Sequence, residues 1–145
     1  MRVTSNMQRL CLTALVLTRL ITFVAFPHPV IWPDSPSYLP HGWLDTYNLD
    51  FFGNSIRAWP VTLFYSLLSQ PIIIILAQLF LSAVCWSFMI IQFGKLFLST
   101  RSAQIFIVTA TLIGCCPQVV QWDTTILANS LQISSLMALL GGLAL

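Results

Sequence analysis

Four long runs of apolar residues, separated by shorter polar segments, organise this chain. They cover about 10–26, 67–93, 103–120 and 125–145. A helix rises about 1.5 Å per residue and the hydrocarbon core of a bilayer is about 30 Å thick, so a spanning helix needs about 20 apolar residues, or about 17 as a practical minimum. The third run reaches that length only if residues 117–120 continue it. The pattern predicts an all-α membrane protein, a single domain of about four transmembrane helices over residues 1–145.

The charged residues are separated by sign across the predicted spans. Arg2 and Arg9 precede the first run, and Lys95 and Arg101 lie between the second and the third. Cytoplasmic loops retain Lys and Arg during insertion, so we predict a multi-pass integral membrane protein whose two termini are cytoplasmic. The acidic residues occupy the alternate gaps, which are then on the outer side: Asp34, Asp45, Asp50 and Asp123.

The composition supports a membrane protein and excludes a nucleic-acid-binding one. Charged residues make up 7% of the chain, whereas a soluble domain carries roughly 25%. Hydrophobic residues make up 57%. The few basic residues are scattered and form no patch that could follow a phosphate backbone, so we predict contact with membrane lipid and none with nucleic acid.

The first apolar run has a second interpretation, as a cleaved signal peptide with Arg2 and Arg9 as its basic region. Three details favour an uncleaved span. Arg19 interrupts the apolar core, no A-x-A pattern lies near its end, and Pro27 follows directly.

The fourth run carries a stripe of small residues at every fourth position: Ser130, Ser134, Ala138 and Gly142. In lipid such a stripe lets two helix backbones approach closely. The chain stops at Leu145 without a polar flank, so we expect a truncated chain whose stripe faces further transmembrane helices or subunits.

The segment 27–66 between the first two runs is long for a connection between neighbouring helices, and such segments are usually functional or disordered. Asp34 lies a few residues beyond the first span. Pro36 suits the first turn of a short helix capped by Ser35, and the positive end of that turn would keep the nearby carboxylate ionised. An ionised carboxylate is a competent general base. The alternative is that Asp34 only ends a turn.

Two short motifs in this outer loop carry a family resemblance. Asp34 with Tyr38 follows the first span, and Pro60 with Tyr65 precedes the second. This arrangement resembles the N-terminal portion of the polytopic membrane glycosyltransferases of the GT-C superfold, such as the protein mannosyltransferases and aminoarabinose transferases. Relatives often carry two adjacent acids where Ser35 follows here, so a second-acid role is unassigned.

The resemblance implies transfer of a sugar from a polyprenyl-phosphate donor to an acceptor on the non-cytoplasmic side. Asp34 would take the proton of the acceptor, while Tyr38, Arg57 and Asp123 would bind substrate. Arg57 would balance the phosphate charge, or else anchor the loop at the interface. For Asp123, which precedes the fourth run, the alternative is a helix-dipole or capping role. A charge at the centre of a span costs about 2.5–3.5 kcal/mol on insertion scales, so we expect Arg19 to reach toward the outer interface or a bound phosphate.

No cofactor is predicted. His28, His41, Asp45 and Asp50 could gather around a divalent cation, although no spacing selects them over ordinary surface turns. The alternative to an enzyme is a non-enzymatic integral membrane protein, such as an assembly subunit of a larger membrane complex. A transporter or proton relay is disfavoured, because Arg19 is the one ionisable residue well inside a predicted span.

Overall fold

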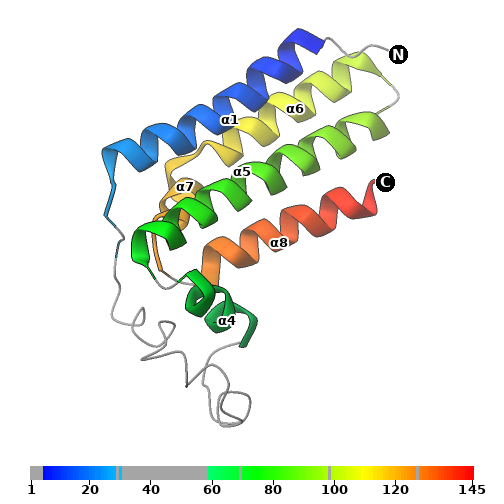
Figure 1. The fold of residues 1–145 in the computed structure, drawn as a ribbon. Helices are drawn as coiled ribbons and strands as arrows, with labels where there is room; N and C mark the ends of the chain where they lie inside the picture. The colour runs from blue at the N-terminus through cyan, green and yellow to red at the C-terminus, as the bar shows by residue number, and fades with distance from the viewer. Residues whose placement is uncertain (1–4, 29, 31–58, 69, 98, 127) are drawn as a thin grey trace.

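The computed structural model describes residues 5–28, 30, 59–68, 70–97, 99–126 and 128–145. Its helices are α1 (Ser5–Ala25), α4 (Trp59–Leu68), α5 (Pro71–Leu96), α6 (Thr100–Gly114), α7 (Pro117–Asp123) and α8 (Ala128–Leu143). The long helices α1, α5, α6 and α8 lie side by side and alternate in direction, so α1 begins at the end of the bundle where α8 ends (Figure 1). The described part of the chain is all-helical apart from one isolated β-bridge, which confirms the all-α prediction.

Two helices, or three if a bent pair counts as one, are long and apolar enough to cross a membrane. The two are α1, over Asn6–Ala25, and α5. The bent pair is α6 with α7, whose axes differ by 56°. Helix α8 has 16 residues, so it is about 24 Å long and shorter than a hydrocarbon core of about 30 Å. The prediction of four full spans is therefore not confirmed.

Prolines set the two breaks that the apolar runs did not reveal. Pro71 occupies the first turn of α5 and Pro117 that of α7, where a missing N–H group costs nothing. A residue before proline is disfavoured in the α region, and Gln70 and Cys116 are both extended, with ψ of 130° and 135°. The predicted span 67–93 thus began within α4, and the predicted span 103–120 is divided between α6 and the first residues of α7.

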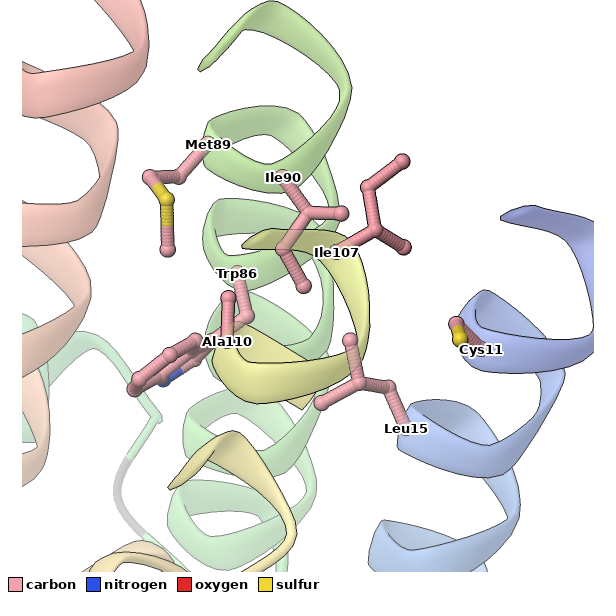
Figure 2. Packing of buried hydrophobic residues seen from close by; sticks show 7 residues of the cluster. All are labelled: Cys11, Leu15, Trp86, Met89, Ile90, Ile107 and Ala110. Carbon is pink, nitrogen blue, oxygen red and sulfur yellow. The ribbon is translucent and has the colours of Figure 1, made fainter. Parts of the chain in front are cut away.

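One hydrophobic core fills the space between α1, α5 and α6. Its buried residues come from all three helices: Cys11, Leu15, Trp86, Met89, Ile90, Ile107 and Ala110 (Figure 2). Helix α6 approaches α1 closely at Gly114, where an added Cβ would lie 2.9 Å from Leu15 Cδ2. We call this cluster the apolar core.

Helix α8 packs along α5, and this contact corrects the predicted small-residue stripe. Ser130 and Ser134 are buried within this chain. A Cβ on Gly141 would lie 3.2 Å from Met89 Cα, whereas one on Gly142 meets nothing within 4 Å. At 3.6 residues per turn, position 142 is rotated about 120° from position 130 and position 141 only about 20°. Ser130 and Ser134, predicted to contact further helices or subunits, are instead buried by the chain's own packing. Of the other two residues of the stripe, Ala138 is half-buried and Gly142 is exposed.

Candidate functional site

Helix α5 carries two polar residues on its buried face, and they begin the candidate site. Gln78 and Ser82 lie one turn apart in an otherwise apolar stretch, and both are fully buried. Positions i and i+4 share one face of a helix. Each side chain meets a polar group from another helix, as described below.

Ser82 belongs to a network centred on Arg19, in the C-terminal half of α1. Arg19 Nη2 donates a hydrogen bond to Ser82 Oγ at 3.1 Å. Arg19 Nε lies 3.6 Å from Asp123 Oδ2, and both side chains are buried, with exposed fractions of 3% and 4%. Ser130 Oγ donates to Asp123 Oδ1 at 2.8 Å. This Arg19 network joins α1, α5, α7 and α8.

The network corrects the prediction for Arg19. Its charge is balanced by a carboxylate of the same chain, which lowers the cost of holding a guanidinium away from water. The pairing is incomplete, because a separation of 3.6 Å is longer than a hydrogen bond. Within the described ranges, Arg19 Nε and Nη1 and Asp123 Oδ2 have no hydrogen-bond partner. The pair therefore neutralises two charges while leaving some of their hydrogen-bonding capacity unused.

Gln78 forms a second network at the same end of the bundle. Its Nε2 donates to Tyr65 Oη at 2.8 Å and to the Thr125 carbonyl oxygen at 3.3 Å. Tyr65 of α4 is buried and packs with Val61 and Ile126 in a small hydrophobic cluster. The amide of Gln78 thus ties α4 and α5 to the turn between α7 and α8.

The turn itself receives a third connection, from the segment after α1. Val30 pairs in parallel with Thr125 as an isolated β-bridge. Val30 N donates to the Thr124 carbonyl oxygen at 3.0 Å, and Ile126 N donates to the Val30 carbonyl oxygen at 3.3 Å. Residues 123–126 are all buried, and we call them the junction.

The residues predicted to act on substrate divide into two groups. Asp34, Tyr38 and Arg57 lie outside the described residues, as do His41, Asp45 and Asp50. Asp123 is described: its carboxylate lies beside the Arg19 guanidinium and accepts a hydrogen bond from Ser130. Its substrate-binding role stays a prediction. His28 is exposed, and in the described part of the chain no three His, Cys, Asp or Glu side chains gather as metal ligands would.

The sequence interpretation missed Gln78, Ser82 and Thr125 as site residues. A signal was present for the first two. Polar side chains inside a long apolar helix turn toward protein partners, because lipid offers them no hydrogen bonds. For Thr125 there was no signal, since its contribution is a backbone carbonyl.

Comparison with protein-family models, with curated proteins and with solved structures found no match for this chain.

Proposed function

We propose that this chain is part of a membrane glycosyltransferase that transfers a sugar from a polyprenyl-phosphate donor to an acceptor on the non-cytoplasmic side. The junction is the observation that supports it. Val30 is bridged to Thr125 just before segment 31–58, and Tyr65 is bonded to Gln78 just after it. The described residues Val30 and Tyr65, on either side of the segment that carries the proposed base, are therefore bonded at one place in the bundle.

The proposed chemistry lies within that segment. Asp34 follows Val30 by four residues and removes the proton of the acceptor hydroxyl as the lipid phosphate leaves. Tyr38 and Arg57 bind the donor, and the Arg57 guanidinium stabilises the charge that develops on the phosphate. Arg57 stands two residues before α4, the helix that the hydrogen bond between Tyr65 and Gln78 connects to α5.

Asp123 acts in this proposal as a positioning residue. Its pair with Arg19 holds the end of α7 against α1, and the next residues supply the carbonyl and N–H groups that bond Val30. Loss of the pair would shift the start of the loop, and a displacement of 1 Å at a reacting group can cost about 10²-fold in rate.

The test is sugar transfer from a radiolabelled polyprenyl-phosphate donor in membranes that contain the chain, with protein levels matched between variants. A general base contributes about 10²–10⁴-fold, so Asp34→Asn should lower transfer by that factor. Asp45→Asn and Asp50→Asn are the matched controls in the same loop and should lower it less. Activity of Asp34→Asn within about threefold of the parent would contradict the assignment of Asp34, because that loss is below the range of a base.

A non-enzymatic membrane subunit is the second candidate function, and one observation favours it. Arg19 and Asp123 neutralise each other within the chain, so these two buried charges require no ligand. In that case the Arg19 network serves only to hold the helices together. Membranes that contain folded parent protein but show no donor-dependent transfer would favour the subunit over the enzyme.

A further inference from the structure

The bend between α6 and α7 carries two adjacent cysteines. Cys115 ends α6 and Cys116 precedes α7, and the two helix axes differ by 56° across this step. Both thiols are free, and both residues are half-buried. The other cysteines, Cys11 and Cys85, are buried within α1 and α5. Partly exposed thiols can be reached by a reagent, whereas buried structural ones are inert.

The exposed side chains of α7 favour a position of the bend at the membrane interface. Gln118 and Gln121 of this helix are both exposed. Lipid offers no hydrogen-bond partner to an exposed amide, so these side chains are suited to contact with water. The thiol of Cys116 donates a hydrogen bond to Gln118 Oε1 at 2.6 Å, on the same exposed side. A water-soluble reagent can therefore approach Cys116.

Cys115 has a different environment from Cys116. It packs against the apolar core, and it lies close enough to Arg19 for the guanidinium to interact with an ionised thiol. In the described ranges, Arg19 Nε and Nη1 have no hydrogen-bond partner. A thiolate formed at Cys115 would therefore lie near a cation whose hydrogen-bonding capacity is not fully used.

The backbone at the bend lets the two side chains approach each other. Neighbouring residues inside a regular helix do not face each other, but Cys116 is extended, with φ of −62° and ψ of 135°. Adjacent Cα atoms are about 3.8 Å apart across a trans peptide, which is shorter than the span of about 4.4–6.8 Å that is usual for disulfides. A disulfide between neighbours is therefore strained and easily reduced, which suits a reversible site.

We propose that Cys115 and Cys116 form a redox-active dithiol that exchanges with small soluble disulfides. The Cys116 thiolate attacks one sulfur atom of a disulfide such as oxidised glutathione, which forms a mixed disulfide and releases one glutathione thiolate. The Cys115 thiolate then attacks the sulfur of Cys116, which closes the protein disulfide and releases the second glutathione thiolate. The protein loses two electrons and two protons, and the glutathione disulfide is reduced to two thiols. The proposal does not depend on glycosyl transfer.

The experiment uses the full chain, reduced, purified in detergent micelles and then incubated with oxidised glutathione. The reaction is stopped with acid, the chain is denatured in SDS with N-ethylmaleimide, and its peptides are mapped by mass spectrometry. The peptide that contains Cys115 and Cys116 should be lighter by two hydrogen atoms and carry no maleimide. Excess reduced glutathione should restore both maleimide adducts. Cys11 and Cys85 are the internal controls and should carry maleimide throughout.

Two variants separate the roles of the two thiols. Cys115→Ser removes the second nucleophile, so the glutathione adduct at Cys116 should increase about tenfold over the parent, because a neighbouring thiol competes with free glutathione at a high effective concentration. Cys116→Ser removes the thiol on the exposed side and should react more slowly with oxidised glutathione. The measurement on the parent chain depends on neither variant.

Four results would overturn the proposal. A parent chain that keeps both maleimide adducts in oxidised glutathione would show that the pair is inert. Stable glutathione adducts on the parent would show that the two sulfur atoms do not meet. A disulfide that excess reduced glutathione leaves intact would not be a reversible site. A disulfide-linked dimer in place of the internal bond would assign these thiols to a contact between copies of the chain.

Discussion

The two ends of the helical bundle are built from different kinds of contact. From the middle of the bundle toward the end where α1 begins, the apolar core joins α1, α5 and α6 through side chains such as Leu15, Trp86 and Ile107. At the other end the Arg19 network, the Gln78 network and the Val30 bridge all meet at the junction. The apolar core is held by the fit of apolar side chains, and the junction is connected by directed polar bonds.

This difference has a physical meaning in a membrane. Apolar side chains gain little by leaving lipid for a neighbouring helix, because lipid tails are equally apolar, so their contacts select a partner mainly by fit. A buried charge or amide must find a specific partner, because leaving it unpaired in hydrocarbon is costly. The junction therefore determines which helices become neighbours, and the apolar core determines how closely they pack.

If the bundle crosses the membrane, its two ends lie on opposite sides, and labelling should separate them completely. We expect Gln118→Cys, on α7 at the junction end, to react with an impermeant maleimide in intact cells. Arg101→Cys, at the start of α6, should react only after permeabilisation. Both positions are exposed, and the native cysteines are replaced by alanine in both variants. Labelling of residue 101 in intact cells would reverse the predicted orientation.

The largest effect on stability should come from breaking the buried ion pair. Arg19→Leu or Asp123→Leu alone should lower the free energy of unfolding by about 3–5 kcal/mol, because each leaves a buried charge without its partner. The double variant should recover most of that loss. Unfolding by SDS in mixed micelles measures all three, with exposed Arg101→Leu as the control. Equal, additive losses in the double variant would show that the two charges do not stabilise each other.

Overpacking the α5–α8 contact should have a smaller effect. Gly141→Leu places a side chain against Phe88 and Met89, where a single Cβ would already be 2.5 Å from Phe88 Cδ1. Inserting extra carbon atoms in a packed region typically costs about 1–3 kcal/mol. Gly142→Leu, the adjacent position with open space around it, is the matched control in the same unfolding assay. Similar losses in the two variants would contradict the described face of α8.

The apolar runs predicted where long helices occur, but they did not predict where those helices end. Hydropathy identified a long apolar segment for α1 and for α5, because composition alone decides whether a helix is stable in lipid. Residues that precede proline, Gln70 and Cys116, ended helices that hydropathy had joined. A rule based on the residue before proline would have found both breaks.

The candidate site was predictable only in its residue types. Arg19 and Asp123 were each singled out from the sequence, but their contact depends on how α1 and α7 are placed, which no local pattern contains. The prediction of one small-residue face on α8 was wrong for a geometric reason. Positions four residues apart move gradually around a helix with 3.6 residues per turn, so they do not stay on one face. Asp34 and Tyr38 lie outside the described residues and stay predictions.

The long separation of Arg19 and Asp123 in the chain gives biosynthesis an order of events. The two residues are 104 positions apart (123 − 19). Ribosomes add about 5–20 residues per second, so Asp123 is made about 5–20 s after Arg19. During that interval α1 is already at the membrane with a cation and no counter-charge from α7. The helix that is made first can therefore settle fully only after α7 has emerged, which makes the last third of the chain a requirement for the final placement of the first helix.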